Sequence, residues 1–164
     1  MALEPFETLD RATAEFEKRL RLVSAEQWSQ PTPCEGWTVT DLVRHVVNAD
    51  VMAVVVLHGG SREDAVTAMS TDALGDDPVG AYCTRRDAMV AAFREDGALE
   101  RTCAHPVGDI PGAQLMGFRV ADHTMHAWDL ARAIGADETL DAELVETVWE
   151  ALEPLIPFIG SLGM

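Results

Sequence analysis

Apolar residues recur every three or four positions along most of this chain, which is the period of amphipathic helices. The first such stripe spans residues 5–23, with charged residues on its other face. It consists of Phe6, Leu9, Ala12, Phe16, Leu20 and Val23. A capping-box pattern at residues 24–27 predicts one short extra helical turn. Pro31 and Pro33 then interrupt the period, because proline lacks an amide donor and disfavours helix before it.

A second helix is predicted after Thr38, a typical N-cap residue, and extends to about His58. Gly59 and Gly60 supply its stop signal. One seam of this helix is formed by Leu42, His45, Ala49, Met52 and Val56. His45 therefore points where the core is expected.

Three later helices have start signals of their own. Asp77 followed by Pro78 predicts a helix to about residue 94. A long helix is expected between Pro111 and Gly135, and another after Asp141. The apolar residues along this last helix are Leu144, Val145, Val148, Trp149, Leu152 and Leu155.

The remaining segments are predicted as connections. Residues 61–77 form a polar loop, with a helical turn around residues 62–69 as an option. Residues 96–110 cross one end of the bundle, and short extended pairing around residues 102–107 is a second option. The chain is therefore predicted to be all-α, a single helical-bundle domain over residues 1–164 with an additional C-terminal helix.

Charge and cysteine content narrow the classes of function. The 164 residues carry 28 acidic and 12 basic side chains, a formal charge of −16, which argues against nucleic acid and anionic membranes as partners. The longest apolar run, residues 51–57, is too short to cross a bilayer, and the N-terminus lacks the features of a signal peptide. Three widely spaced cysteines favour free thiols and a cytoplasmic location. The apolar stretch at residues 156–159 is a candidate surface for a homodimer.

Candidate chemistry is concentrated in residues 121–130 of the long helix. Asp122 and His126 are four residues apart and share one helix face, a spacing that lets both reach one metal ion. His45 is the best candidate for a third ligand. Two imidazoles and a carboxylate with open positions suit zinc and also non-haem iron.

Other interpretations of the same residues remain open. His45 and His126 could be core histidines satisfied by a carbonyl, and Asp122 a helix-surface partner. His123 could replace Asp122 as a ligand, but we expect it to be flanking or on the surface, because it points about 100° away around the helix. Asp129 is either a group that supports the metal ligands or a cap for a neighbouring loop. Arg119 is a group that supports the metal ligands, a group that binds an acidic substrate, or a surface arginine.

Three motifs resemble a known family. They are Pro-Thr-Pro-Cys-Glu-Gly-Trp at residues 31–37, Asp-Leu-Val-Arg-His-Val-Val at residues 41–47, and Asp122 with His-Ala-Trp-Asp-Leu-Ala-Arg at residues 126–132. This combination resembles the mycothiol-dependent maleylpyruvate isomerase N-terminal-type family, within the DinB-like metal-binding superfamily. The resemblance implies a four-helix bundle with a crossover connection. It also implies a divalent metal, usually zinc or nickel, on the positions of His45, Asp122 and His126. The isomerase has a glutamate where this chain has Asp122.

The function that this resemblance implies is a metal- and mycothiol-dependent transferase or isomerase, whose partners are a small-molecule thiol and an electrophile. The metal would convert the thiol into a thiolate. A non-catalytic metal-binding or regulatory module is the alternative from another class. A bundle without metal and metal-assisted hydrolysis are the remaining hypotheses.

Overall fold

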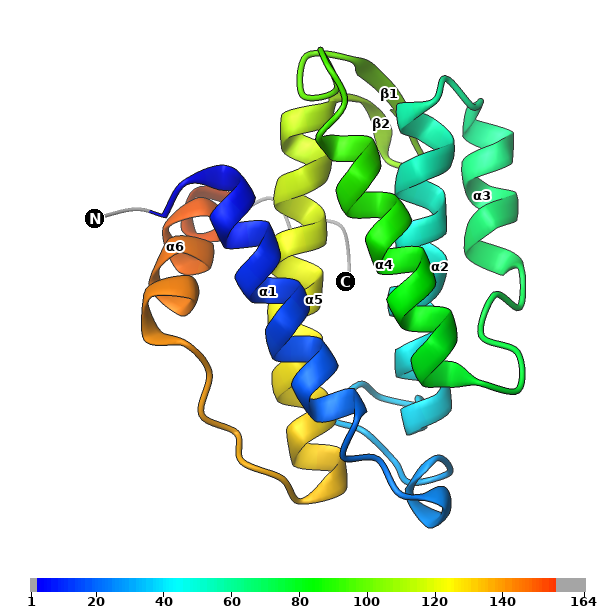
Figure 1. Ribbon diagram of the computed structural model, residues 1–164, viewed down its shortest axis with the longest axis vertical. Coiled ribbons are helices and arrows are strands. Elements are labelled where there is room, and N and C mark those ends of the chain that lie inside the picture. The colour runs from blue at the N-terminus through cyan, green and yellow to red at the C-terminus, as the bar shows by residue number, and fades with distance from the viewer. Residues whose placement is uncertain (1–2, 156–164) are drawn as a thin grey trace.

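The computed structural model describes residues 3–155, and four long helices form its bundle (Figure 1). They are α1 (Pro5–Leu20), α2 (Val39–Leu57), α4 (Pro78–Phe93) and α5 (Gly112–Ile134). Helices α2 and α4 run in the same direction, because α3 (Arg62–Ser70) returns the chain along the outside of α2 (Figure 1). The predicted DinB-like four-helix bundle with a crossover connection is confirmed, and α3 is the crossover.

The helix boundaries follow the predicted start and stop signals. Thr38 caps α2 through a capping box with Asp41, and Asp77 caps α4 ahead of Pro78. Gly135 ends α5 in the left-handed conformation, with φ of 68°, which glycine adopts without a Cβ clash. The short turn predicted at residues 24–27 is the 3-10 helix η1 (Ala25–Gln27).

Two connections contain more structure than a plain loop. The optional turn after residue 61 is the full helix α3, which Ser61 caps with Asp64. The optional pairing is a β-hairpin, in which β1 (Thr102–His105) runs antiparallel to β2 (Gly108–Pro111). The hairpin lies across one end of the bundle and leads directly into α5 (Figure 1).

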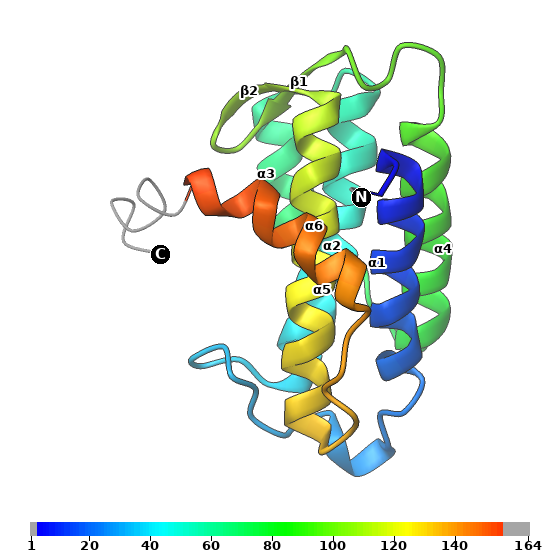
Figure 2. The same cartoon turned by 90° about the vertical axis from the view of Figure 1, so that its left-hand side faces the viewer.

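The additional helix α6 (Ala142–Leu152) crosses α5 on one side of the bundle (Figure 2), and the 3-10 turn η2 (Glu153–Leu155) follows it. Leu144 and Val148 on this helix are buried, whereas Val145 and Trp149 have relative exposures of 42% and 55%. Both lie outside the stripe that contacts the bundle, which is narrow because α6 packs on one side only. The apolar stretch at residues 156–159 lies outside the described residues.

The core is divided into two apolar clusters along α2 and α5. At the hairpin end, Met52, Val56 and Leu115 belong to one cluster. At the other end, Val43, Val47 and Leu130 belong to the second. Neither cluster includes Asp50 on α2 or Asp122, His123 and His126 on α5, and these polar residues lie along the helices between the two apolar sets. The fold thus brings polar residues of two helices together inside an apolar frame.

Two further expectations concern the whole chain. All three cysteines are free thiols, as expected. Among residues 3–155, no helix combines the length and the apolar character needed to cross a membrane.

Candidate metal centre

Three side chains, one from α2 and two from α5, lie close together inside the bundle. Nε2 of His45 lies 3.3 Å from Oδ1 of Asp122, and Nε2 of His126 lies 3.3 Å from the same oxygen. The three residues form a group whose ligand atoms all lie within 4.8 Å of one another. The structure therefore brings together the two helix-borne residues and the distant histidine that the sequence singled out.

The spacing of these atoms fits a small divalent cation. In a tetrahedral zinc site with bonds of about 2.0–2.1 Å, neighbouring ligand atoms are about 3.3 Å apart. Two imidazole nitrogens and one carboxylate oxygen are a frequent ligand set for zinc and for other divalent transition metals. The residues present fit the metal that the resemblance implies.

Asp129 fixes the ring of His126. Its Oδ2 accepts a hydrogen bond of 2.9 Å from Nδ1 of His126, which leaves Nε2 on the side of Asp122. A carboxylate behind a ligating histidine is the usual way in which a metal site selects the histidine tautomer and orientation. The structure thus places Asp129 directly behind a candidate ligand, and its Oδ2 also accepts a bond from Cys34 of the loop before α2.

Arg119 occupies the second oxygen of Asp122. Its Nη1 donates to Oδ2 of Asp122 at 2.7 Å, while its Nε and Nη2 donate to Oδ1 of Asp50 at 3.1 and 2.9 Å. The arginine is 3% exposed and Asp50 is fully buried. The surface alternative for Arg119 is therefore wrong, and two carboxylates of the chain, one of them a candidate metal ligand, hold its guanidinium.

His123 is fully buried, and its ring lies near Phe16 of α1 and Tyr82 of α4. Its Nδ1 donates to the carbonyl oxygen of Arg119 at 2.8 Å, and its Nε2 faces Oδ2 of Asp50 at 3.3 Å. The expected surface position was therefore wrong, and the geometry does not bring His123 into the ligand group. The expectation was built on the angle around α5 alone, and it did not consider that α1 and α4 cover that face with Phe16 and Tyr82.

In the metal-free protein, the surroundings favour an ionised Asp122 next to a protonated His126. Burial acts to raise the pKa of Asp122, but the charge of Arg119 and hydrogen bonds with His126 and His45 hold it well below its usual range. Burial acts to lower the pKa of His126, but hydrogen bonds with Asp122 and Asp129 raise it to about 9. A metal ion that binds His126 at neutral pH must therefore displace a proton.

The comparisons with known proteins agree with this architecture. The family model of the mycothiol maleylpyruvate isomerase N-terminal domain matches residues 9–131, which include α2 and the ligand-bearing part of α5. The chain belongs to this family. Uncharacterized proteins from two strains of Mycobacterium tuberculosis are each 34% identical to it over 145 residues, which are 87% of this chain and 74% of theirs.

Two solved structures share the fold of this family member. One is the crystal structure of the mycothiol-dependent maleylpyruvate isomerase, with a TM-score of 0.67 at 20% sequence identity. The other is a mutant of that isomerase with one histidine replaced by alanine, with a TM-score of 0.70 at 19% identity. Each match covers 88% of this chain and 68% of the other.

Two residues of the family motif at residues 31–37 lie close to the centre. Trp37 is partly buried, and its ring centroid lies 4.9 Å from that of His45 and 6.0 Å from that of His126. Cys34 donates its thiol to Oδ2 of Asp129 at 3.5 Å. Burial and the neighbouring Asp129 raise the pKa of this thiol to about 11. The sequence signal for both residues is the motif at residues 31–37.

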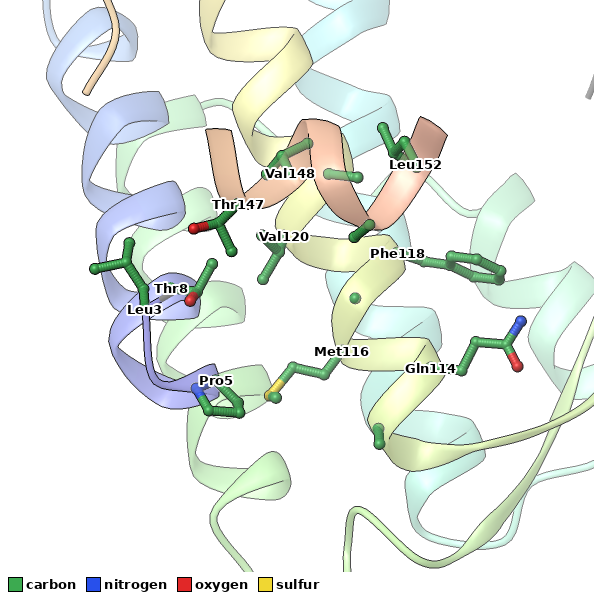
Figure 3. Close-up of a pocket in the computed structure, with 14 residues that line it drawn as sticks. Leu3, Pro5, Thr8, Gln114, Met116, Phe118, Val120, Thr147, Val148 and Leu152 are labelled. Atoms are coloured by element: carbon green, nitrogen blue, oxygen red, sulfur yellow. The ribbon is translucent and has the colours of Figure 1, made fainter. Parts of the chain in front are cut away.

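A separate apolar cavity of this family member lies away from the candidate ligands. It has a volume of about 350 Å³ between α1, α5 and α6, and none of His45, Asp122 and His126 lines it (Figure 3). Pro5, Met116 and Leu152 are among its walls (Figure 3). The cavity and the candidate metal centre are therefore distinct features of the bundle.

Proposed function

We propose that this chain binds one divalent metal ion through His45, Asp122 and His126 and uses it with a low-molecular-weight thiol, mycothiol, to isomerise or S-transfer a small electrophile. The convergence of three ligand atoms, with the two histidine nitrogens each 3.3 Å from one carboxylate oxygen, carries the proposal. The family to which the chain belongs, named for a mycothiol-dependent isomerase, supports the thiol. Zinc suits the ligand set best, and nickel and iron are alternatives.

The chain itself would supply the ligands and their orientation. His45, Asp122 and His126 would hold the metal, and three protein ligands leave at least one position open for a thiol. A bound divalent metal lowers the pKa of a coordinated thiol, so that a thiolate nucleophile is present at neutral pH. Asp129 would hold His126 with Nε2 toward the metal, and Arg119 would hold Asp122 with Oδ1 toward it.

Cys34 is a poor candidate for the nucleophile itself. A thiol with a pKa of about 11 is almost entirely protonated at neutral pH, and the nearby carboxylate of Asp129 opposes its ionisation. An external thiol that meets the metal is therefore the better nucleophile in this site.

Elemental analysis of the untagged protein tests the metal site. About one equivalent of zinc or nickel is expected in the wild-type protein, and His45→Ala should lose it. His58→Ala is the matched control, because His58 is an exposed histidine that pairs with Glu95 on the surface. Metal content that stays the same in His45→Ala would overturn the three-ligand site.

A second measurement tests the use of a thiol. Mycothiol added to the cobalt-substituted protein should produce a sulfur-to-metal charge-transfer absorption band. An unchanged spectrum at saturating mycothiol would exclude a metal-bound thiol and leave metal binding as the function.

A non-catalytic metal-binding module is the second candidate, and one observation favours it. Cys34, His126 and Asp129 form another group whose ligand atoms lie within 4.8 Å of one another, with Asp129 on the Nδ1 side of His126. A thiolate-containing ligand set is typical of structural zinc sites. Metal that is retained in His45→Ala but lost in Cys34→Ser would support this candidate over the first.

A further inference from the structure

Arg119 is shared between two carboxylates that belong to different helices. Asp50 on α2 takes two donors of the guanidinium through its Oδ1, whereas Asp122 on α5 takes only one through its Oδ2. The carbonyl oxygen of Val46 accepts a further bond from Nη2 at 3.3 Å. This division leaves Oδ1 of Asp122 facing the two ligand histidines.

Without Asp50, the guanidinium of Arg119 would be free to bind both oxygens of Asp122. Guanidinium groups prefer to bind a carboxylate with two parallel N–H donors, which occupies both of its oxygens. Asp50 prevents that arrangement, because it already holds Nε and Nη2. Asp50 also balances the positive charge of Arg119, which would otherwise oppose a cation next to Asp122.

An imidazole lies behind Asp50. Oδ2 of Asp50 is 3.3 Å from Nε2 of His123, and neither atom has a hydrogen-bond partner among the described residues. His123 is in turn fixed by its bond to the backbone of Arg119. A buried carboxylate is costly unless it is paired, so its presence between two apolar clusters calls for a role.

We propose that Asp50 is a positioning residue of the metal centre, which acts through Arg119 to keep Asp122 available as a one-oxygen ligand. The inference rests on the proposed metal site, and it concerns a residue that does not touch the metal. It predicts that Asp50 affects the affinity and geometry of the metal without being a ligand.

Asp50→Asn tests this role, because asparagine keeps the size of the side chain and removes its charge. Zinc affinity, measured by competition with a chelator, should fall about 10- to 100-fold, as is usual for groups behind the ligands. The ligand-field spectrum of the cobalt-substituted protein should change as well. Affinity within twofold of wild type, with an unchanged spectrum, would overturn the proposal.

Two control variants separate positioning from general effects. Asp10→Asn removes the same charge from an exposed pair with Arg94. Thr8→Val removes a hydrogen bond of 2.9 Å from a buried threonine to the carbonyl of Glu4, which is not part of the site. Both controls should keep wild-type zinc affinity, and a tenfold loss in either would overturn the specific role of Asp50.

A double-mutant cycle tests whether Asp50 acts through Arg119. In an Arg119→Met background, Asp50→Asn should change zinc affinity by less than twofold. An equal loss of zinc affinity on Asp50→Asn in the wild-type and Arg119→Met backgrounds would overturn the claim that Asp50 acts through Arg119.

Arg119→Lys serves the same purpose if Asp50→Asn does not fold. A lysine cannot bridge two carboxylates with a planar fork, so zinc affinity should fall in a protein whose circular dichroism remains helical. Unchanged affinity would overturn the proposal. A wild-type protein that binds no zinc would defeat the proposed function and this inference together, whereas normal binding in the Asp50 and Arg119 variants would defeat this inference alone.

Discussion

Asp129 accepts a hydrogen bond from Nδ1 of His126 at 2.9 Å, across one turn of the same helix. The bond determines which nitrogen of the imidazole remains available for the metal. We expect Asp129→Ala to weaken zinc binding about 10- to 100-fold, because the ring then loses both its orientation and the carboxylate that increases its basicity.

Chelator competition measures this effect, and Asp137→Ala is the matched control. Asp137 is an aspartate on the loop after α5 whose carboxylate accepts only a local bond from the backbone of Thr139. Equal zinc affinity in Asp129→Ala and Asp137→Ala would contradict the supporting role of Asp129.

The stability of the metal-free protein should depend on pH through His126. Its pKa is about 9 in the folded protein against an ordinary value of 6.5. The stabilisation is therefore fully present below pH 6.5 and is lost as the pH rises through 9, and a shift of this size corresponds to at most about 3 kcal/mol. Urea unfolding of chelator-treated protein at pH 6 and pH 9.5 should show the loss.

His126→Gln provides the control for this prediction, since its stability should vary much less over the same interval. The low pKa of Asp122 affects the stability of the folded protein in acid. Its contribution is fully present above the ordinary pKa of 3.8 and is lost as the pH falls below that value. A wild-type protein that is more stable at pH 9.5 than at pH 6 without metal would contradict the assignment to His126.

The parts of the site that lie within one helix were predictable from sequence. Asp122 and His126 share a face because an α-helix repeats every 3.6 residues, and the same rule indicated the inward face of α2 that contains His45. Most helix ends were also predictable, because capping residues and glycines mark them in the sequence. These signals are local, so they do not depend on how the helices pack.

The parts that depend on packing were not predictable. Asp50 reaches Arg119 only because of the rotation of α2 against α5, and Cys34 reaches Asp129 only because of the path of the loop before α2. No periodicity specifies either contact. The two hairpin strands have four residues each, which is too short for alternation of apolar and polar residues to identify a strand.

Trp37 should report metal binding by its fluorescence. Its indole packs 4.9 Å from the ring of His45 and 6.0 Å from the ring of His126, measured between centroids. Nickel or cobalt bound to these histidines quenches a nearby indole, so Trp37→Phe should remove most of the metal-dependent change. Trp149→Phe is the control, because Trp149 is 55% exposed on α6 and should leave the change intact. Quenching that persists in Trp37→Phe would place the metal elsewhere.

Gly117 in the middle of α5 should be replaceable with a gain in stability. A Cβ added there meets no atom within 4 Å, because the residue borders the apolar cavity of Figure 3. Alanine is favoured over glycine inside a helix by about 1 kcal/mol, so Gly117→Ala should raise the free energy of unfolding by about that amount.

Gly112→Ala, at the start of the same helix, should have the opposite effect, since its Cβ would lie 2.0 Å from the carbonyl oxygen of Ala98. Denaturant unfolding of the two variants makes the comparison. Zinc affinity should be unchanged in Gly117→Ala, because the cavity does not include the candidate ligands. A loss of stability in Gly117→Ala would show that the space beside α5 is filled, and a loss of zinc affinity would show that the cavity and the metal centre are coupled.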